Sequence, residues 1–585
     1  MRERPDLFNL RPNRRIGLVN KVDSCRVNVS TTDERQLRRA NVNGYVILHT
    51  ADANARLIGR IARVVRFEAD PGKNEDARGF GTVLNDVTIH ALGTLKGPGG
   101  GREQAVFTRA VESLPEIGAQ CFLLLGEDLA QFVALVAEGS ARHGAPLSLG
   151  TYALADEPET EAWLDGNAFF QRHALIVGST GSGKSWAVAA LMEQVAELAS
   201  ANAILFDLHG EYEPLAKHPR VTRYRIAGPA DLERPGDSAL FLPYWLLGYE
   251  DMLALILDRS DENAPNQAMA FSQAVVHAKR ASLSAAGMAE ELDTFTIDSP
   301  VPYRLDDAVA EIAELNEQKV PGKNGPVNGP FYGRFNRFLP RLDAKRSDRR
   351  LGFLFALPEA ALSSSYLDVL AEKLMRAGSA ERAGVKIVDF SEVPSDILPM
   401  VIGLTARLVF QLQMWSDRRH RRPIALICEE AHLYLPHRAA ADAAEARALD
   451  PFGRIAKEGR KYGVSLLVVS QRPSELNPAV ASQCHNVVAL RLAHSADKSA
   501  VSRLLPENQG GIEDLLATLG VGEAVVVGDA CPLPSRIRLR EPAYAPESPS
   551  VRFWDEWSRA ANEQNLALTV RNLRRQTASR ADAQA

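Results

Sequence analysis

The segment from Gly178 to Ser185 reads GSTGSGKS and matches the phosphate-binding pattern G-x-x-x-x-G-K-[ST]. Glycines at Gly178, Gly181 and Gly183 allow backbone N–H groups to turn toward phosphate oxygens. A lysine at the seventh position reaches the β and γ phosphates, and the hydroxyl that follows it binds Mg²⁺. The spacing therefore predicts a site for a nucleoside triphosphate, with ATP and Mg²⁺ as the cofactors.

The flanks of this loop supply the elements that a phosphate loop needs. Residues 174–177 form a short apolar run that is typical of a buried parallel strand, and apolar residues recur at helical spacing after Ser185. Strand, glycine loop and helix follow one another in the required order. The predicted nucleotide-binding residues are Gly178, Ser179, Thr180, Gly181, Ser182, Gly183, Lys184, Ser185 and Trp186.

A pair of carboxylates follows a second apolar run. The segment 424–432 reads IALICEEAH, in which five residues predict a strand and Glu429 and Glu430 come directly after it. Hydrolysis needs one acid near Mg²⁺ and one that activates water, and we assign these roles to Glu429 and Glu430 respectively. Asp207, at the end of the run AILFD, and Glu211 are further acids expected near Mg²⁺.

Polar residues also border the run VSLLVVS, which begins at Val464. Gln471 ends this predicted strand and is placed to sense the γ phosphate. Arg460 precedes the strand and could reach the nucleotide of a neighbouring subunit as an arginine finger. The alternative for Arg460 is a solvated basic turn, because charge runs usually face water.

The composition is that of an ordinary globular protein of two or three domains. The chain has 585 residues and a net charge of −5, so nucleic-acid binding would depend on a local patch or a pore lining. Its five cysteines lie far apart with no C-x-x-C pair, which argues against a disulfide framework or a zinc ribbon. No secretory signal and no run of 18 apolar residues occurs. We expect a cytoplasmic protein.

The pattern of elements predicts an α/β fold in which a parallel sheet carries the motifs. Short β-rich segments suggest a small N-terminal barrel, and a mostly helical stretch interrupts the sheet domain. Within that stretch, the Gly/Pro-rich segment 319–333 is expected to lack regular structure. The predicted divisions are a β-barrel over 1–150, the first part of the ATPase core over 151–249, the helical insertion over 250–380, the second part of the core over 381–544, and a C-terminal helix with a polar tail over 545–585.

The motifs GSTGSGKS, DLHGEY, EEAH and EGRKYGVSLLVVSQRP, in this order, resemble those of the HerA family of hexameric DNA-translocating ATPases, relatives of FtsK in the RecA-like group. The β-rich N-terminal segment resembles that family's barrel. The site residues that the resemblance implies are Lys184 and Ser185 for nucleotide and Mg²⁺, Asp207 as an acidic residue, Glu430 as the catalytic glutamate, Gln471 as the sensor, Arg460 as the trans-acting arginine and Arg172 as a second interface arginine.

Two features depart from the family pattern. Many P-loop enzymes have Asp where this chain has Glu429, although a longer carboxylate still reaches the Mg²⁺ water shell. The Ala-rich segment 438–450 has no clear counterpart, which leaves Arg454 and Arg460 as alternatives for the trans-acting arginine.

The resemblance implies a homo-hexamer with double-stranded DNA in its central channel, working with a partner nuclease in DNA end processing or antiphage defence. The alternative is a ring-shaped scaffold that regulates an effector enzyme, such as a nuclease or a sirtuin-like NAD-consuming protein, with translocation secondary. Lys319, Lys323 and Arg334 are candidate DNA contacts, and a solvated surface loop is the competing interpretation for them.

Overall fold

The structure of the protein is a computed structural model. It describes residues 8–575 except 9, 11, 32–33, 39, 41, 43, 69–82, 98–104, 142–145, 154–160, 438–442, 506–511, 532, 548–552 and 560–565. The chain forms two compact units and passes between them more than once. Unit 1 comprises residues 1–191, 467–475 and 481–542, and unit 2 comprises residues 192–466, 476–480 and 543–585.

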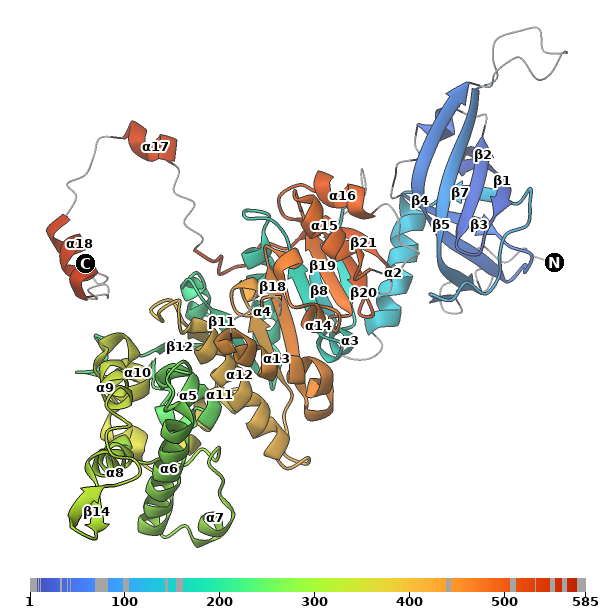
Figure 1. The fold of residues 1–585 in the computed structure, drawn as a ribbon. Helices are drawn as coiled ribbons and strands as arrows, with labels where there is room; N and C mark the ends of the chain where they lie inside the picture. Colours follow the sequence, from blue (N-terminus) through green and yellow to red (C-terminus); the bar gives the residue numbers. More distant parts are fainter. Residues whose placement is uncertain are drawn as a thin grey trace. The chain divides into compact units, whose positions relative to one another are not determined.

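The N-terminal part of unit 1 is an antiparallel barrel, drawn in blue in Figure 1. Its strands are β1 (Arg15–Val22), β2 (Arg26–Thr31), β3 (Tyr45–His49), β4 (Ala55–Glu68), β5 (Val83–Lys96), β6 (Val106–Thr108) and β7 (Gln120–Leu123). They lie in the order β2-β1-β7-β3-β4-β5-β6, and pairing of β2 with β5 closes the ring. Apolar side chains such as Val27, Val46 and Ile89 fill the interior, as predicted for a small barrel.

The remainder of unit 1 is a sheet around the phosphate loop. Its strands, in spatial order, are β18 (Val464–Ser470), β10 (Ala174–Val177), β19 (Asn486–Leu490), β20 (Glu523–Gly528), β21 (Ser535–Leu539), β8 (Leu147–Tyr152) and β9 (Glu161–Leu164). The accompanying helices are α2 (Glu127–Ala141), α3 (Gly166–Gln171), α15 (Ser495–Ser502) and α16 (Ile512–Thr518). The short helix α1 (Glu34–Leu37) belongs to the barrel, whose core includes Leu37. The first part of α4 (Lys184–Ala196) also belongs to this unit.

Strand direction differs from the sequence-based expectation in part of this sheet. β10 runs parallel to β18 and β19, as predicted. β20, whose run EAVVV was assigned to a parallel sheet, pairs antiparallel with β19 and with β21. A buried apolar run indicates that a strand is covered on both faces, but it does not indicate the direction of the strand relative to its neighbours. The sequence pattern therefore could not reveal that β20 is antiparallel.

Unit 2 contains a parallel sheet of five strands. In spatial order these are β13 (Ala239–Leu240), β12 (Val221–Ile226), β16 (Val385–Asp389), β11 (Ala203–Asp207) and β17 (Ile424–Cys428). The last three are buried at every residue, and the helices α12 (Leu398–Trp415) and α13 (Ala443–Tyr462) pack together beside the sheet. Because the strands are parallel, the residues that follow β11, β16 and β17 share one edge.

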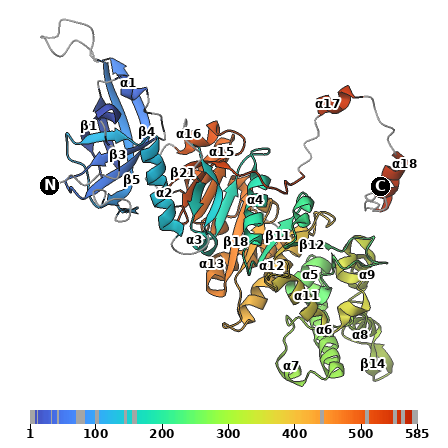
Figure 2. The ribbon, with the colours of Figure 1, turned by 180° about the vertical axis from the view of Figure 1, so that it is seen from behind.

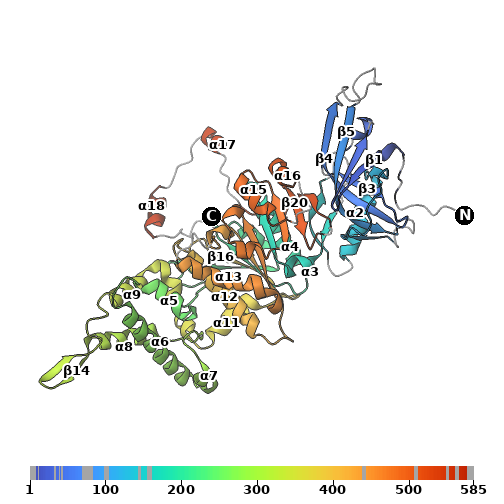
Figure 3. The same ribbon diagram turned by 45° about the vertical axis from the view of Figure 1, so that its right-hand side comes forward.

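The predicted insertion is helical, as Figure 2 shows in green and yellow. Its helices are α5 (Tyr249–Ile256), α6 (Ala264–Ala286), α7 (Ala289–Thr294), α8 (Leu305–Glu317), α9 (Phe338–Ser347), α10 (Gly352–Phe355) and α11 (Tyr366–Met375). The Gly/Pro-rich segment contradicts the expectation of no regular structure. It forms a hairpin of β14 (Lys319–Gly322) and β15 (Gly325–Asn328) beyond α8 (Figure 3), because Gly325, at φ +120°, supplies the turn conformation.

The C-terminal segment begins with contacts to unit 2. The backbone N–H groups of Ala543 and Tyr544 donate to the Glu193 carboxylate on α4, at 3.1 and 2.7 Å. Two short helices follow, α17 (Phe553–Ser558) and α18 (Leu566–Arg575). The five cysteines are free thiols. Within the described ranges, no helix combines the length and the apolar character needed to cross a membrane.

Candidate nucleotide-binding and catalytic site

The phosphate loop connects β10 to α4, the order of elements that the sequence predicts. Gly181 and Gly183 have φ values of +71° and +108°, which L side chains rarely adopt. Position 178 has room only for glycine, because a Cβ there would lie 2.5 Å from Ser182 Oγ and 2.7 Å from Leu490 Cβ. Each of the three glycines therefore has a geometric reason to be glycine, and the backbone between them can curve around phosphate.

Two backbone bonds hold the loop in shape. The Ser179 N–H donates to the Arg491 carbonyl at 2.8 Å, and the Ser182 N–H donates to the Ser179 carbonyl at 3.1 Å. The side chain of Lys184, a residue only 6% exposed, bends back over the loop, and its Nζ lies 3.4 Å from the Ser179 carbonyl oxygen. A compact cation held over a glycine loop is the arrangement that neutralises β and γ phosphates.

Ser185 and Trp186 occupy the first turn of α4. Ser185 is half-buried, whereas Trp186 is 41% exposed. Ser185 comes directly after Lys184 in the first helical turn, where N–H groups and the helix dipole favour anions.

Gln471 is brought to the phosphate loop from a distant part of the sequence. β18 pairs with β10 in parallel register, with Ser470 opposite Val177, so that the residues after both strands are neighbours. The Thr180 hydroxyl donates to Gln471 Oε1 at 2.6 Å. Within unit 1, the sensor predicted from sequence thus contacts the loop in which a γ phosphate would bind.

The predicted carboxylates lie at the shared edge of the sheet of unit 2. Asp207 ends β11, and Glu429 directly follows Cys428, whose partner in β11 is Phe206. Asp207 and Glu429 are 1% and 4% exposed. Two buried carboxylates in one row repel each other, so this edge favours a cation or a proton nearby.

Glu430 has a backbone conformation that is rare for a residue with a side chain. Its φ and ψ are both 43°, in the left-handed region. It shares a positive φ with one other non-glycine residue among those described, His173, immediately before β10. Such strain persists where surrounding structure imposes it, and it clusters at functional sites. His432 Nδ1 lies 3.3 Å from Glu430 Oε2, so this imidazole contacts the carboxylate to which we assign water activation.

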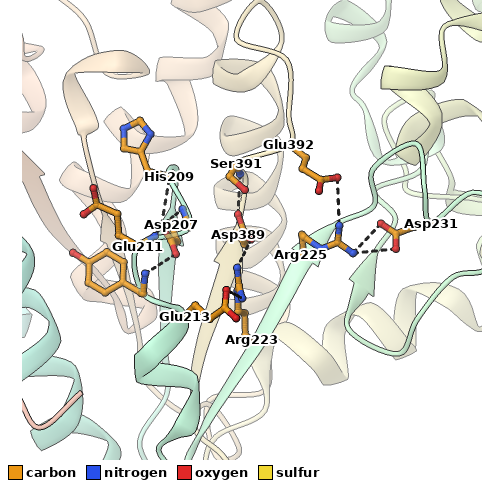
Figure 4. Close-up of polar contacts among 12 residues, drawn as sticks. Asp207, His209, Glu211, Glu213, Arg223, Arg225, Asp231, Asp389, Ser391 and Glu392 are labelled. Carbon is orange, nitrogen blue, oxygen red and sulfur yellow. Dashed lines mark hydrogen bonds and ion pairs between the residues drawn. The ribbon is translucent and has the colours of Figure 1, made fainter. Parts of the chain in front are cut away.

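Asp207 holds the turn of the DLHGEY motif. One of its oxygens accepts from the N–H groups of His209, Gly210 and Glu211 at 3.3, 2.8 and 3.1 Å, and the other accepts from Tyr212 N–H at 3.1 Å (Figure 4). Both oxygens are therefore engaged by backbone donors. This arrangement fits the indirect role near Mg²⁺ expected for Asp207.

A buried ion-pair network that sequence reasoning missed lies beside this turn. Asp389, at the end of β16, is the register partner of Asp207 and is 1% exposed. Arg223 on β12 donates to Asp389 at 2.8 Å and pairs with Glu213 at 2.7 Å. Figure 4 shows these side chains converging above the strand ends. Arg223 thus supplies the positive charge that lets a second carboxylate lie next to Asp207.

The network continues along β12. Arg225 pairs with Asp231 at 2.9 Å and with Glu392 at 3.3 Å. Arg223 and Arg225 alternate with Tyr224 in the run VTRYRI, so both arginines lie on one face of the strand. The sequence signal was therefore present as an i, i+2 pair of arginines, but their acidic partners come from segments far apart in the chain.

The pH dependence of stability should report on Asp207. Burial raises the pKa of Asp207 to about 6 from its ordinary 3.8, against the lowering effect of the backbone donors and with a further increase from Asp389. The folded state therefore binds this proton more tightly than the unfolded chain. The stabilisation is complete below about pH 4 and is lost as the pH rises through about 6.

We accordingly expect the free energy of unfolding of the wild type, relative to Asp207→Asn, to fall by about 2 kcal/mol between pH 4 and pH 7. Urea denaturation of both proteins across this range measures the difference. The exposed Asn324→Ala is the control, because it removes no ionisable group, and it should show a nearly constant difference. A wild-type-minus-D207N difference that stays flat, or rises with pH, would contradict the raised pKa.

The three candidate arginines differ in their contacts. Arg460, in the last turn of α13, is exposed, and its guanidinium pairs with no carboxylate in the described part of the chain. Arg454 is stacked over the Phe410 ring at 5.0 Å and lies 3.5 Å from Glu458. Arg172 lies 3.7 Å from Asp529 within unit 1. Both arginines of α13 are exposed, and Arg460 is the one that has no carboxylate or aromatic partner among the described residues. The segment before α13, residues 438–442, lies outside the described residues.

The phosphate loop of unit 1 fits the phosphates of ATP, and unit 2 carries the predicted acids separately. The phosphate loop with Lys184, Ser185 and Gln471 belongs to unit 1, and Asp207, Glu429, Glu430 and Arg460 belong to unit 2. No cluster of three or more metal-ligating His, Cys, Asp or Glu side chains occurs among the described residues. Mg²⁺ binds few protein ligands and keeps its waters and phosphate oxygens, so it does not need such a cluster. Within unit 1, Ser185 is the residue whose hydroxyl would bind it. The assignment of Glu429, in unit 2, to Mg²⁺ stays a prediction.

The class of protein follows from this architecture. A glycine loop leads from a central parallel strand into a helix, and carboxylates follow a second buried parallel strand. These features define a P-loop ATPase with a RecA-like core, an N-terminal barrel and a helical insertion.

Comparison with known proteins shows similarity to the HerA helicases. Residues 147–409 match the family model "Helicase HerA, central domain". The DNA double-strand break repair helicase HerA of Pyrococcus furiosus is 26% identical over 422 residues, covering 67% of this chain and 69% of the relative. HerA of Saccharolobus solfataricus is 24% identical over 379 residues, covering 63% and 64%. The chain thus spans about two thirds of the length of these relatives, and its residues 147–409 are similar to the HerA central domain.

Two solved structures also match. VirB4 of Thermoanaerobacter pseudethanolicus has a TM-score of 0.44 and 17% identity, and the match covers 69% of this chain and 98% of that chain. The plasmid coupling protein TrwB in complex with ADP and Mg²⁺ has a TM-score of 0.42 and 14% identity, and the match covers 70% and 93%.

Proposed function

We propose that this chain is the subunit of a cytoplasmic homo-hexameric ring that uses ATP hydrolysis to move along double-stranded DNA held in its central channel. The observation that supports the proposal is the phosphate loop contacted by Gln471, in a chain whose residues 147–409 match the HerA central-domain model. Relatives of this chain are named as DNA double-strand break repair helicases. Hydrolysis takes place between subunits, with Glu430 activating water and Arg460 entering from the neighbour.

The partner that we propose is a nuclease supplied with DNA by the ring, in end processing or in antiphage defence. A scaffold that regulates an effector enzyme is the second candidate, and it predicts that partner activity depends on ring assembly but not on DNA movement. A displacement assay that follows a roadblock on duplex DNA, with and without the partner, separates the two functions.

Binding to DNA in a channel should depend on salt and not on sequence, because phosphates supply the contacts. We expect two unrelated duplexes of equal length to bind with equal affinity. Each affinity should fall by roughly a thousandfold or more between 50 and 200 mM salt if about six phosphates are neutralised. Anisotropy titrations at several salt concentrations, with the oligomeric state checked by mass photometry, measure this. A preference for one sequence that persists at high salt, or a monomer that binds equally well, would contradict the proposal.

Of the earlier candidate contacts, Arg334 is engaged within the insertion. Its guanidinium donates to Asn263 Oδ1 at 2.7 Å and to the Pro330 carbonyl at 3.0 Å. Lys319 and Lys323 remain exposed on the β14–β15 hairpin. We therefore propose only the two lysines as contacts for DNA.

A further inference from the structure

The loop between α12 and β17 carries a concentrated positive charge. Residues 418–422 read RRHRR, and Arg418, Arg419 and Arg422 are exposed. None of these three guanidiniums pairs with a carboxylate among the residues the structure describes. Unpaired arginines in succession on one loop create a strong local positive potential.

The other cations of this loop have structural partners. Arg421 donates to the carbonyls of Met414 and Ser416 at 3.3 and 2.9 Å, and its guanidinium lies over the Tyr462 ring. His420 lies 3.2 Å from Asp417. Arg421 therefore fixes the loop against α12 and α13, while the three remaining arginines keep their hydrogen-bonding capacity for a ligand.

An exposed indole and a groove adjoin these arginines. Trp415, the last residue of α12, is 82% exposed. It lines a groove of about 790 Å³ between α11, α12 and residues 296–300, together with apolar Leu367, Met375 and Leu412. Arg422 and His420 also line the groove. Of the three exposed arginines, Arg422 lines the groove, while Arg418 and Arg419 lie on the adjoining loop. One carboxylate, that of Asp298, also lines the groove.

This combination matches the chemistry of a single nucleic-acid strand. A base presents a flat ring that stacks on an indole or fills an apolar slot, and the phosphates on either side bind guanidinium groups. A duplex hides its base faces, so it would use the arginines but not Trp415. The charge is complementary to a polyanion, because the three exposed arginines have no acidic partners of their own.

The loop is also separate from the ATPase residues. It precedes β17, whereas Glu429 and Glu430 follow the same strand. The two sites therefore lie at opposite ends of a buried five-residue strand, and residues in the loop can be changed without touching the catalytic carboxylates.

We propose that Trp415 and the arginines Arg418, Arg419 and Arg422 form a binding site for single-stranded DNA outside the ATPase centre, with a base stacked on the indole and phosphates held by the guanidiniums. The proposal rests on the proposed function as a DNA-handling ATPase. It adds a second DNA site, which holds a strand whose bases are exposed.

The test uses the full-length protein and two probes, fluorescein-labelled oligo-dT and a duplex of the same length. The variants are Trp415→Ala and the triple variant Arg418→Ala, Arg419→Ala and Arg422→Ala. The matched controls remove exposed residues of the same types elsewhere in unit 2: Trp554→Ala with Trp557→Ala, and Arg234→Ala with Arg349→Ala and Arg350→Ala. ATPase activity without DNA should be unchanged in every variant.

We expect Trp415→Ala to lower oligo-dT affinity at least fivefold while leaving duplex affinity within twofold, because stacking on one base contributes about 1–3 kcal/mol. The triple variant should lower oligo-dT affinity more than tenfold and reduce the slope of log K against log salt by about 2, for three lost phosphate contacts. Intrinsic fluorescence quenching on oligo-dT binding should be reduced in Trp415→Phe.

Unchanged oligo-dT affinity in both loop variants would overturn the second site while leaving the proposed function intact, provided that the wild type binds DNA. An acidic protein segment in the groove would give that result. If Trp415→Ala lowered the affinity for oligo-dT and for the duplex equally, the proposed second site would also be overturned, because base stacking would then not be involved. Failure of the wild type to bind either probe is the separate outcome that contradicts the proposed function.

Discussion

Lys184→Ala is expected to reduce ATP hydrolysis to background and to weaken nucleotide binding at least tenfold. Lys184 is the side chain that the phosphate loop directs toward the β and γ phosphates. Because Lys184 is only 6% exposed, water that enters the space left by alanine would not fully replace its contacts with phosphate. Loss of this cation removes charge neutralisation from both the bound state and the transition state. Malachite-green assays of phosphate release and binding of a fluorescent ATP analogue measure the two effects.

Leu198→Ala is the control, because Leu198 lies just beyond the C-terminal end of the same helix, away from the phosphate loop, and is 46% exposed. It should hydrolyse ATP at close to the wild-type rate. Thermal denaturation of both variants checks that the fold is retained. Near-normal turnover by Lys184→Ala would refute the assignment of the phosphate loop.

Co-assembly of two inactive variants is expected to restore ATPase activity. Glu430→Gln keeps the size of the side chain but removes the base, so hydrolysis should fall by roughly a hundredfold or more. In Arg460→Ala, the rate of ATP hydrolysis should fall by about a thousandfold, because this arginine neutralises charge on the γ-phosphoryl oxygens of the neighbouring subunit's nucleotide. In mixed rings, some interfaces pair an intact glutamate with an intact arginine, and those interfaces should turn over.

Arg454→Ala is the control for this experiment. Its guanidinium is stacked over Phe410 and lies near Glu458, so we expect a small loss of stability and less than a tenfold loss of activity. Activity should be followed across mixing ratios, in rings shown by native mass spectrometry to contain both variants. No recovery at any ratio would mean that each site is complete within one subunit. A greater loss of ATPase activity in Arg454→Ala than in Arg460→Ala would mean that Arg454, and not Arg460, is the trans-acting arginine.

The sequence accurately predicted the strands that precede the predicted catalytic residues. The apolar runs before the phosphate loop and before Glu429 coincide with β10 and β17 at both ends. These runs are short, buried on both faces and bounded by residues that cannot continue a strand, so composition alone delimits them. The helix after the loop begins at Lys184, one residue before the predicted start.

The sequence could not reveal features that depend on distant partners. The pairing of Arg223 with Asp389 joins residues from strands separated by the whole insertion, and the contact of Gln471 with Thr180 joins residues nearly three hundred positions apart. The hairpin within residues 319–333 was missed for a different reason. Its strands contain Pro and Gly, which are rare in strands, and it forms because two glycines flank a two-residue turn.

The interleaved order of the strands has a consequence for how the chain folds. β11 pairs with β17, roughly 220 residues later, and β10 pairs with β19, roughly 310 residues later. Such long-range pairings require large loops to close before their contacts stabilise them, so folding is slow and the partly made sheets expose unpaired edges. Neither sheet can be completed on the ribosome until most of the chain has emerged. This protein should therefore depend on chaperones during synthesis more than a chain whose strands pair with their sequence neighbours.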